Sequence, residues 1–218
     1  MTLFKMCGMM RPHDASLAAE LGASHIGAIF AQSVRRVSLD SAIHIFDAVR
    51  QDARCVGVFD STSSPAEIAA TAVGCGVDIV QLHGSASPAD IRTIRHSFDG
   101  QIWYVIGVDP ASQSLPVIEA DLYDVVDGLL IDSRVNGHTG GTGVSTRWAD
   151  IAPDVSRLAL RRPIILAGGL NPSNVTRAIS TLHPAIVDVS SGVETRPGVK
   201  DPDLMLAFAE AVSSASIE

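Results

Sequence analysis

The chain has 218 residues, of which 46% are hydrophobic but only 5% aromatic, so we expect a core made mainly of Val, Ile, Leu and Ala. The formal net charge is −8 and no basic cluster exceeds two residues, which excludes the basic stripe of a non-specific nucleic-acid binder. No apolar run approaches the roughly 18 residues of a membrane-spanning helix, so we expect neither nucleic acid nor membrane as a partner.

Short apolar runs recur along the chain, separated by amphipathic segments of similar length. Most of these runs are rich in β-branched residues and are too short for buried helices, which predicts strands. The eight runs span residues 3–7, 25–30, 55–59, 78–82, 102–108, 128–132, 163–167 and 185–189.

Several of the intervening segments begin with a capping residue followed by proline, which is typical of a helix start. Starts of this kind are Ser64-Pro65, Ser87-Pro88, Asn171-Pro172 and Asp201-Pro202. Further helices are expected after Pro12 and Ser38 and, less clearly bounded, near residues 112–121 and 145–158. The helix that starts at Ser64 is expected to end at Gly74.

Regular alternation of strands and helices predicts parallel strands joined by right-handed crossovers. Eight such units predict a compact, closed (β/α)8 TIM barrel, and we assign residues 1–218 to a single domain. A doubly wound open sheet is the alternative, which the number and even spacing of the units disfavour. In a barrel of this kind the active site lies at the carboxyl ends of the strands, in the loops that follow them.

The turns after the seventh and eighth strands have the composition of a phosphate site. Gly168 and Gly169 follow the seventh strand, and Ser190, Ser191 and Gly192 follow the eighth. Glycine lets backbone N–H groups approach a ligand, and barrels often bind phosphate with these two loops. Tight turns are the alternative for either loop alone. Two such turns on consecutive strands favour a phosphorylated small molecule as the ligand.

Cys7 is one of three cysteines, with Cys55 and Cys75, and no pair has the CxxC spacing of a zinc or redox site. We therefore expect no disulfide framework, a reducing compartment and, without a signal peptide, a cytoplasmic protein. At the end of the first strand, Cys7 is either a thiolate base or nucleophile, or a small apolar filler. Lys5 points the same way in the strand alternation and could lower the pKa of Cys7.

Three other side chains are candidates for chemistry at the same face. Asp132 ends the sixth strand among apolar residues and suits a general acid, although it could also be a cap or a partner for Arg134. His83 is either a ligand contact or a structural histidine. Arg35 or Arg36 either binds a carboxylate or lies on the surface.

These strand ends resemble the N-(5'-phosphoribosyl)anthranilate isomerase family of tryptophan biosynthesis. The matching stretches are KMCG, GAIFAQSVRRVS, VGVF, VQLHG, LLIDS with GGTG, AGGLNPSNV and VDVSSGVETRPGVKD. They follow the family's order from residue 5 to residue 201. The resemblance implies a ribulose-phosphate-binding barrel that uses no metal and no organic cofactor. It also implies an Amadori rearrangement of N-(5-phosphoribosyl)anthranilate to 1-(2-carboxyphenylamino)-1-deoxy-D-ribulose 5-phosphate.

The resemblance also implies roles for individual residues. It makes Cys7 the general base and Asp132 the general acid, and it assigns the anthranilate carboxylate to Arg35. Substrate contacts fall on Gln81, His83 and Asp188, and phosphate contacts fall on Gly168, Gly169, Ser190, Ser191 and Gly192.

The chain departs from the family pattern at two places. Val34 replaces the usual proline before Arg35, and Thr146-Arg147-Trp148 stands where the family usually has Phe-Asp-Trp. The first change affects the aim of Arg35, and the second affects the loop after the sixth strand. A histidine-pathway or bifunctional aminoaldose isomerase and a non-catalytic phosphate-binding barrel stay open as alternatives. We expect a monomer, although dimers occur in the family.

Overall fold

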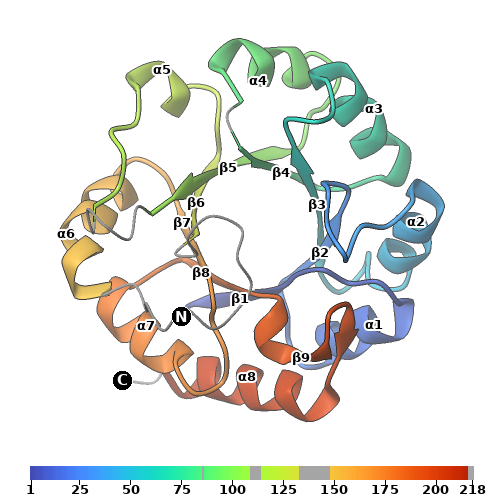
Figure 1. Ribbon diagram of the computed structural model, residues 1–218, viewed down its shortest axis with the longest axis vertical. Coiled ribbons are helices and arrows are strands. Elements are labelled where there is room, and N and C mark those ends of the chain that lie inside the picture. The colour runs from blue at the N-terminus through green and yellow to red at the C-terminus, as the bar shows by residue number, and fades with distance from the viewer. Residues whose placement is uncertain (85, 109–113, 133–147, 216–218) are drawn as a thin grey trace.

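The chain folds into a closed barrel of eight parallel strands, in a computed structural model that describes residues 1–84, 86–108, 114–132 and 148–215 (Figure 1). Each strand pairs with the next along the chain, and β8 pairs with β1 to close the sheet. The strands are β1 Leu3–Met6, β2 His25–Ile29, β3 Arg54–Asp60, β4 Ile79–His83, β5 Gln101–Gly107, β6 Gly128–Asp132, β7 Ile164–Ala167 and β8 Ile186–Val189. The predicted TIM barrel is confirmed, and all eight apolar runs form strands.

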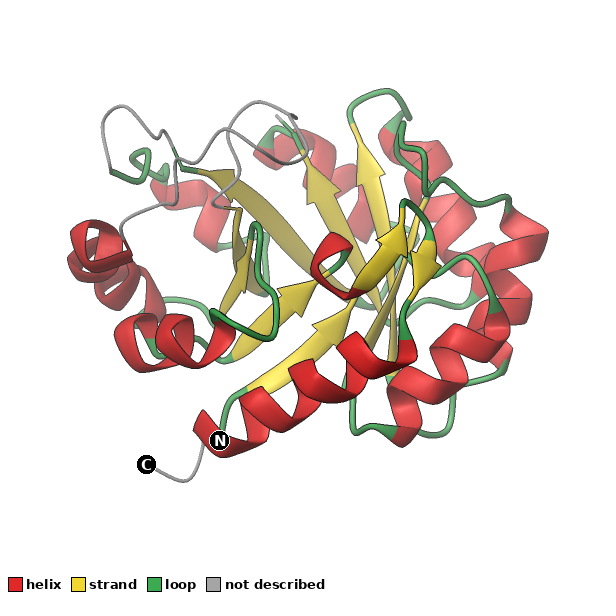
Figure 2. Cartoon of the chain, turned by 60° about the horizontal axis from the view of Figure 1, so that its bottom comes forward, coloured by secondary structure: helices red, strands yellow, loops and turns green. Residues whose placement is uncertain are grey.

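Helices surround the barrel on the outside, as Figures 1 and 2 show. They are α1 Pro12–Glu20, α2 Leu39–Asp47, α3 Pro65–Cys75, α4 Pro88–Arg95, α5 Ala120–Tyr123, α6 Trp148–Ala159, α7 Val175–Leu182 and α8 Pro202–Ala215. A 3₁₀ turn, η1 Ser191–Val193, and a small hairpin of β9 Glu194–Arg196 and β10 Val199–Lys200 separate β8 from α8. None of the helices in the described ranges combines the length and apolarity that crossing a bilayer requires.

Side-chain caps define the starts of two neighbouring helices. At α3 the Ser64 hydroxyl accepts from the Glu67 backbone N–H, and the Glu67 carboxylate accepts from the Ser64 N–H. Ser87 and Asp90 form the same reciprocal box at α4. Each cap satisfies backbone donors that the first helical turn leaves unpaired and contributes about 1 kcal/mol. The predicted starts of both helices are confirmed.

Two predicted helix boundaries are wrong. Gly76, and not Gly74, ends α3, because Gly76 adopts the left-handed conformation (φ 63°) that terminates a helix. Helix α7 begins at Val175, three residues later than Asn171-Pro172 predicts. The Asn171 side chain accepts a hydrogen bond from the Ser173 backbone N–H at 2.9 Å and so forms a local turn instead of a helix cap.

The helices after β5 and β6 agree unequally with the sequence prediction. Helix α5 is a single turn, Ala120–Tyr123, and residues 114–119 before it are not helical, so the predicted extent is wrong. Pro116 disfavours helical geometry at the residue before it, which agrees with the lack of helix in this segment. Helix α6, Trp148–Ala159, agrees with the prediction except for residues 145–147, which lie outside the described residues together with 109–113.

The strands are buried on both faces. Their outward side chains pack against the helices in one large cluster, and their inward side chains fill the barrel. The interior cluster is Val56, Ile79, Trp103, Val105, Leu130, Ile165, Ala167 and Ile186. This double burial explains why the strands are continuously apolar instead of alternating. Because the interior is packed, ligands have access only at the strand ends.

Candidate active site

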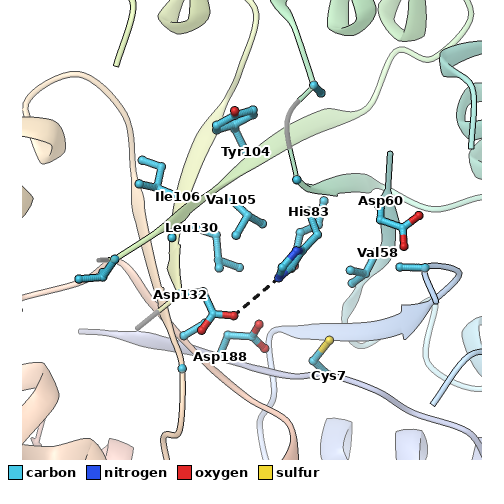
Figure 3. A pocket seen from close by; sticks show the side chains of 18 of the residues that line it. Cys7, Val58, Asp60, His83, Tyr104, Val105, Ile106, Leu130, Asp132 and Asp188 are labelled. Atoms are coloured by element: carbon cyan, nitrogen blue, oxygen red, sulfur yellow. Dashed lines mark ion pairs between the residues drawn. The ribbon is translucent and has the colours of Figure 1, made fainter. Parts of the chain in front are cut away.

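A cavity of about 1270 Å³ lies at the carboxyl ends of the barrel strands (Figure 3). All but one of the site residues predicted from the sequence line this cavity. They are Cys7, Arg35, Gln81, His83, Asp132, Gly168, Gly169, Asp188, Ser190 and Ser191. The exception is Gly192, which packs against the chain at Leu170. A Cβ on Gly192 would lie 1.9 Å from the Leu170 carbonyl oxygen, so close packing of two turns requires glycine there.

Cys7 lies beside a buried ion pair. Lys5 on β1 and Asp188 on β8 are register partners, so their side chains share one face, and Lys5 Nζ lies 2.9 Å from Asp188 Oδ2. Lys5 is fully buried and Cys7 is 5% exposed. A Cβ on Gly27 of the neighbouring strand would lie 2.9 Å from Cys7 Sγ and 3.1 Å from Lys5 Cε. Gly27 therefore leaves the space that both side chains occupy.

Burial and charge act in opposite directions on this group. Burial raises the pKa of the Cys7 thiol above its ordinary value, and the charge of Asp188 adds to this rise, while the Lys5 ammonium opposes both. Burial alone would lower the pKa of Lys5, but Asp188 and Cys7 outweigh burial and raise it, so Lys5 stays charged. Lys5 is therefore the main group that favours the Cys7 thiolate.

Asp132 and His83 face each other across the cavity mouth. Asp132 ends β6 and is 8% exposed, and its Oδ2 lies 3.7 Å from His83 Nε2 (Figure 3). This contact is an ion pair only when the imidazole is protonated. The His83 side chain is about half exposed. Arg134, the other partner considered for Asp132, lies outside the described residues.

Arg35 points into the molecule, whereas Arg36 is exposed. Arg35 is 8% exposed, lines the cavity and donates from Nε and Nη2 to the Glu194 carboxylate at 2.9 and 2.7 Å. Its aliphatic stem crosses Gly8, where a Cβ would lie 2.8 Å from Arg35 Cδ. Gly8 also has φ 74°, so both the backbone and the space require glycine.

Sequence reasoning missed Glu194 and Lys200, which form a buried ion pair behind Arg35. Lys200 Nζ lies 2.9 Å from Glu194 Oε1, and these side chains are 1% and 3% exposed. Both residues lie in the stretch VETRPGVKD that supports the family resemblance. The sequence around Glu194 and Lys200 contains Pro and Gly and has no hydrophobic periodicity from which inward-pointing side chains could be predicted. A buried charge in a turn-rich stretch is visible only once the hairpin is known.

The turns after β7 and β8 present main chain to the cavity. Gly168 and Gly169 both have left-handed φ values, 98° and 70°, and a Cβ on Gly169 would meet no atom within 4 Å among the described residues. Asn174 donates from Nδ2 to the Gly169 carbonyl at 3.0 Å and fixes the first turn. Ser190 and Ser191 line the cavity from the second turn. Two turns rich in glycine and serine that line the cavity from adjacent strands suit an anionic ligand.

Gln81 adds a polar group from β4 on the cavity wall. Gln81 is 4% exposed, and within the described ranges its Oε1 has no hydrogen-bond partner. A buried amide oxygen is costly unless it accepts a hydrogen bond. The position of Gln81 in the cavity therefore suits a ligand that donates from a hydroxyl or amine.

The whole chain matches proteins of one family. The model of the N-(5'phosphoribosyl)anthranilate (PRA) isomerase family matches residues 4–211. The N-(5'-phosphoribosyl)anthranilate isomerase of Desulforamulus reducens is 38% identical over 216 residues, covering 99% of this chain and 97% of the relative. That of Bacillus subtilis is 35% identical over 210 residues, covering 96% and 94%.

Solved structures agree with this match. The phosphoribosyl anthranilate isomerase of Thermotoga maritima is 31% identical and superimposes with a TM-score of 0.84. The match covers 98% of this chain and 100% of that one. A second such structure, solved in complex with reduced 1-(o-carboxyphenylamino)-1-deoxyribulose 5-phosphate, is 30% identical with a TM-score of 0.80, covering 98% of this chain and 100% of that one. The chain therefore belongs to the family of N-(5'-phosphoribosyl)anthranilate isomerases, which are enzymes of tryptophan biosynthesis.

Proposed function

We propose that the cavity isomerises N-(5-phosphoribosyl)anthranilate, with Cys7 as the general base and Asp132 as the general acid. The observation that carries this proposal is that both side chains are buried and line one cavity with Arg35 and with the turns after β7 and β8. The ligand of one solved relative is a reduced carboxyphenylamino deoxyribulose phosphate, which has a carboxylate at one end and a phosphate at the other. The cavity has candidate sites for both groups.

The reaction is a rearrangement that proceeds by proton transfers alone and needs no external oxidant or reductant. Asp132 protonates the furanose ring oxygen, the C1'–O bond breaks, and the nitrogen lone pair forms a Schiff base. Cys7 removes the proton from C2', and the electron pair passes through C1' to the nitrogen to give an enolamine. Tautomerisation to the ketone completes the isomerisation with no net change in atoms or electrons. One group starts charged and the other neutral, which different local environments permit.

The environment of Cys7 supports its role as a base mainly through Lys5. The pKa of Cys7 is raised by burial, which favours the thiol, whereas the Lys5 ammonium favours the thiolate. Lys5 is held by Asp188 at 2.9 Å and cannot move away from the sulfur without breaking that pair. The prediction that Lys5 shares the face of Cys7 is supported by the packing of both side chains around Gly27.

We assign substrate recognition to the remaining walls of the cavity. Arg35 binds the anthranilate carboxylate, and its inward orientation favours it over the exposed Arg36. Gln81, His83 and Asp188 contact the ribose portion. The phosphate lies on the backbone of Gly168, Gly169, Ser190 and Ser191, while the packing of Gly192 against Leu170 supports that surface from behind.

Location and assembly are further expectations for this chain. Three buried free cysteines are consistent with a reducing, cytoplasmic location. One solved relative is described as a monomer generated from a dimeric enzyme of Thermotoga maritima. We keep a monomer as the expectation for this chain, which sedimentation of the purified protein tests directly.

Paired substitutions test the catalytic assignment. Cys7→Ser and Asp132→Asn are each expected to lower kcat by about 10²–10⁴-fold, because proton transfer typically contributes that much. Cys75→Ser is the matched control, since Cys75 is a buried free cysteine in α3 whose thiol donates to the helix carbonyls of Thr71 and Ala72. Cys75→Ser is expected to keep kcat within about threefold, the range of a tolerated buried substitution.

Growth of a tryptophan auxotroph that lacks this isomerase is the matching test in cells. The wild-type chain is expected to restore growth, and the two active-site variants are not. Near-normal rates in both variants would refute the assignment. Turnover of only the aminoaldose of histidine biosynthesis would refute the choice of substrate, and binding without turnover would support the non-catalytic alternative.

A further inference from the structure

Arg35 belongs to a buried cluster of three charges, and the proposed function does not use the other two members, Glu194 and Lys200. The hairpin of β9 and β10 pairs Glu194 with Lys200 and turns both side chains inward. Glu194 accepts from Arg35 Nε and Nη2 and from Lys200 Nζ, all at 3.1 Å or less. One carboxylate therefore holds two cations, away from solvent.

Lys200 ties this cluster to the two loops that flank the proposed chemistry. Its Nζ donates to the Cys7 carbonyl at 2.7 Å, to the Ser190 carbonyl at 3.0 Å and to Glu194 at 2.9 Å. An ammonium has three N–H donors, so Lys200 has an acceptor for each. Glu194 is thus anchored to the main chain at the end of β1 and after β8, which makes it a fixed support.

Glu194 also decides which edge of Arg35 stays available. It binds Nε and Nη2, and within the described ranges Nη1 has no hydrogen-bond partner. Arg35 lines the cavity, and its stem is confined between Gly8 and the Glu194 carboxylate. A guanidinium held along one edge in this way can present its other edge in only one direction.

The charge balance of the cluster favours an anionic ligand. Two cations and one carboxylate leave one excess positive charge in a site where Arg35, Glu194 and Lys200 side chains are each less than 10% exposed. Burial lowers the pKa of Lys200, and the nearby charge of Arg35 adds a smaller lowering, while Glu194 opposes both. A substrate carboxylate on Arg35 would neutralise this excess and is therefore favoured there.

We propose that Glu194 is a positioning residue that orients Arg35, with Nη1 directed toward the carboxylate of the substrate. This inference rests on the proposed role of Arg35 in substrate binding. Lys200 keeps its bonds to the Cys7 and Ser190 carbonyls when Glu194 is changed, so we expect the larger effect through Arg35, on ligands that have the carboxylate. Glu194 is not a contact for the ribose or the phosphate.

A pair of inhibitors separates this role from a general structural one. The first is the reduced carboxyphenylamino deoxyribulose phosphate seen in a relative, and the second is the same compound without the carboxyl group. Glu194→Gln keeps the shape but removes the charge, and the amide cannot accept fully from both cations. We expect about 10- to 100-fold weaker binding of the first inhibitor, from the loss of charged hydrogen bonds, and less than about threefold change for the second. Raised KM with a smaller change in kcat is expected for the substrate.

Two further variants keep the test decisive. Glu194→Asp preserves the charge balance, so we expect it to fold even if the glutamine variant does not. Its shorter side chain is expected to shift the guanidinium and also to reduce the preference for the carboxylate. Glu210→Gln on the exposed face of α8 is the control and leaves both affinities unchanged. Equal weakening of both inhibitors, or unchanged preference in the glutamine and aspartate variants, would refute a positioning role.

Arg35→Ala distinguishes failure of this inference from failure of the proposed function. If Arg35→Ala abolishes the preference and the Glu194 variants retain it, only the role of Glu194 is refuted. If Arg35→Ala retains the preference, Arg35 does not bind the carboxylate, and both assignments are refuted together.

Discussion

Removing Lys5 tests the buried pair on which the charge state of Cys7 depends. Lys5→Met replaces the ammonium with an apolar chain and removes the Lys5 charge from the Asp188 carboxylate, which is 8% exposed. Breaking a buried pair from one side costs about 3–5 kcal/mol, because the remaining charge is desolvated and uncompensated. The free energy of unfolding of a domain is about 5–15 kcal/mol, so this loss is a large share of it.

Urea unfolding at pH 7 measures the loss in free energy of unfolding. The melting temperature should fall by about 6–20 °C, at the roughly 2–4 °C per kcal/mol expected for a chain of this length. The double variant Lys5→Met/Asp188→Asn removes both charges and is expected to recover most of the lost stability. A single variant within 1 kcal/mol of wild type would refute the electrostatic coupling, whatever the activity.

The same variant also tests the influence of Lys5 on catalysis. Without Lys5, burial and the Asp188 charge raise the pKa of Cys7 further. The ascending limb of the kcat/KM profile, which reports the free enzyme's base, should therefore move to higher pH. Each unit of that movement lowers the rate about tenfold at a fixed pH below the limb. A lower rate with an unmoved limb would show that Lys5 has only a structural role.

Two smaller predictions concern the backbone and the pH response. Gly8→Ala is expected to lower the free energy of unfolding by about 1–2 kcal/mol, because the backbone at this position is left-handed. It is also expected to raise KM, because the new methyl group would displace the Arg35 side chain. Unfolding and steady-state assays measure the two effects separately, and an unchanged KM would refute the close approach of Arg35 to Gly8. Burial and nearby Lys5 and Arg54 lower the pKa of His25 to about 4. The unfolded chain therefore takes up the proton first, and stability should fall by about 3 kcal/mol as pH drops from 6.5 to 4, a loss that His25→Gln should largely abolish.

The barrel could be predicted because each strand is buried on both faces and is therefore apolar along its whole length. Short β-branched runs and Ser-Pro starts determine these elements locally, and the structure follows them to within a residue or two at the strands. The expected placement of Cys7 and Asp132 at one face follows from strand polarity alone. Fold and approximate site are thus local properties of this sequence.

The features that could not be predicted from the sequence involve side chains whose hydrogen-bond partner can be either local or distant in the chain. Asn171 could cap a helix or close a turn, and the Ser173 N–H at 2.9 Å decides for the turn. Glu194 is 159 residues from Arg35 in the chain, and no short-range pattern links them. Only the closed barrel and the hairpin after β8 bring such groups together.

Closure of the barrel between β1 and β8 also has a consequence for the order of events during synthesis. Lys5 is paired with a residue 183 positions later, and the Cys7 carbonyl is bound by a lysine 193 positions later. At about 5–20 residues per second, a ribosome needs on the order of 10–40 s to supply those partners. Until then the first strand has an unpaired charge and an open edge. Activity thus appears only at the final step of folding, and a nascent chain stalled before Lys200 should be inactive.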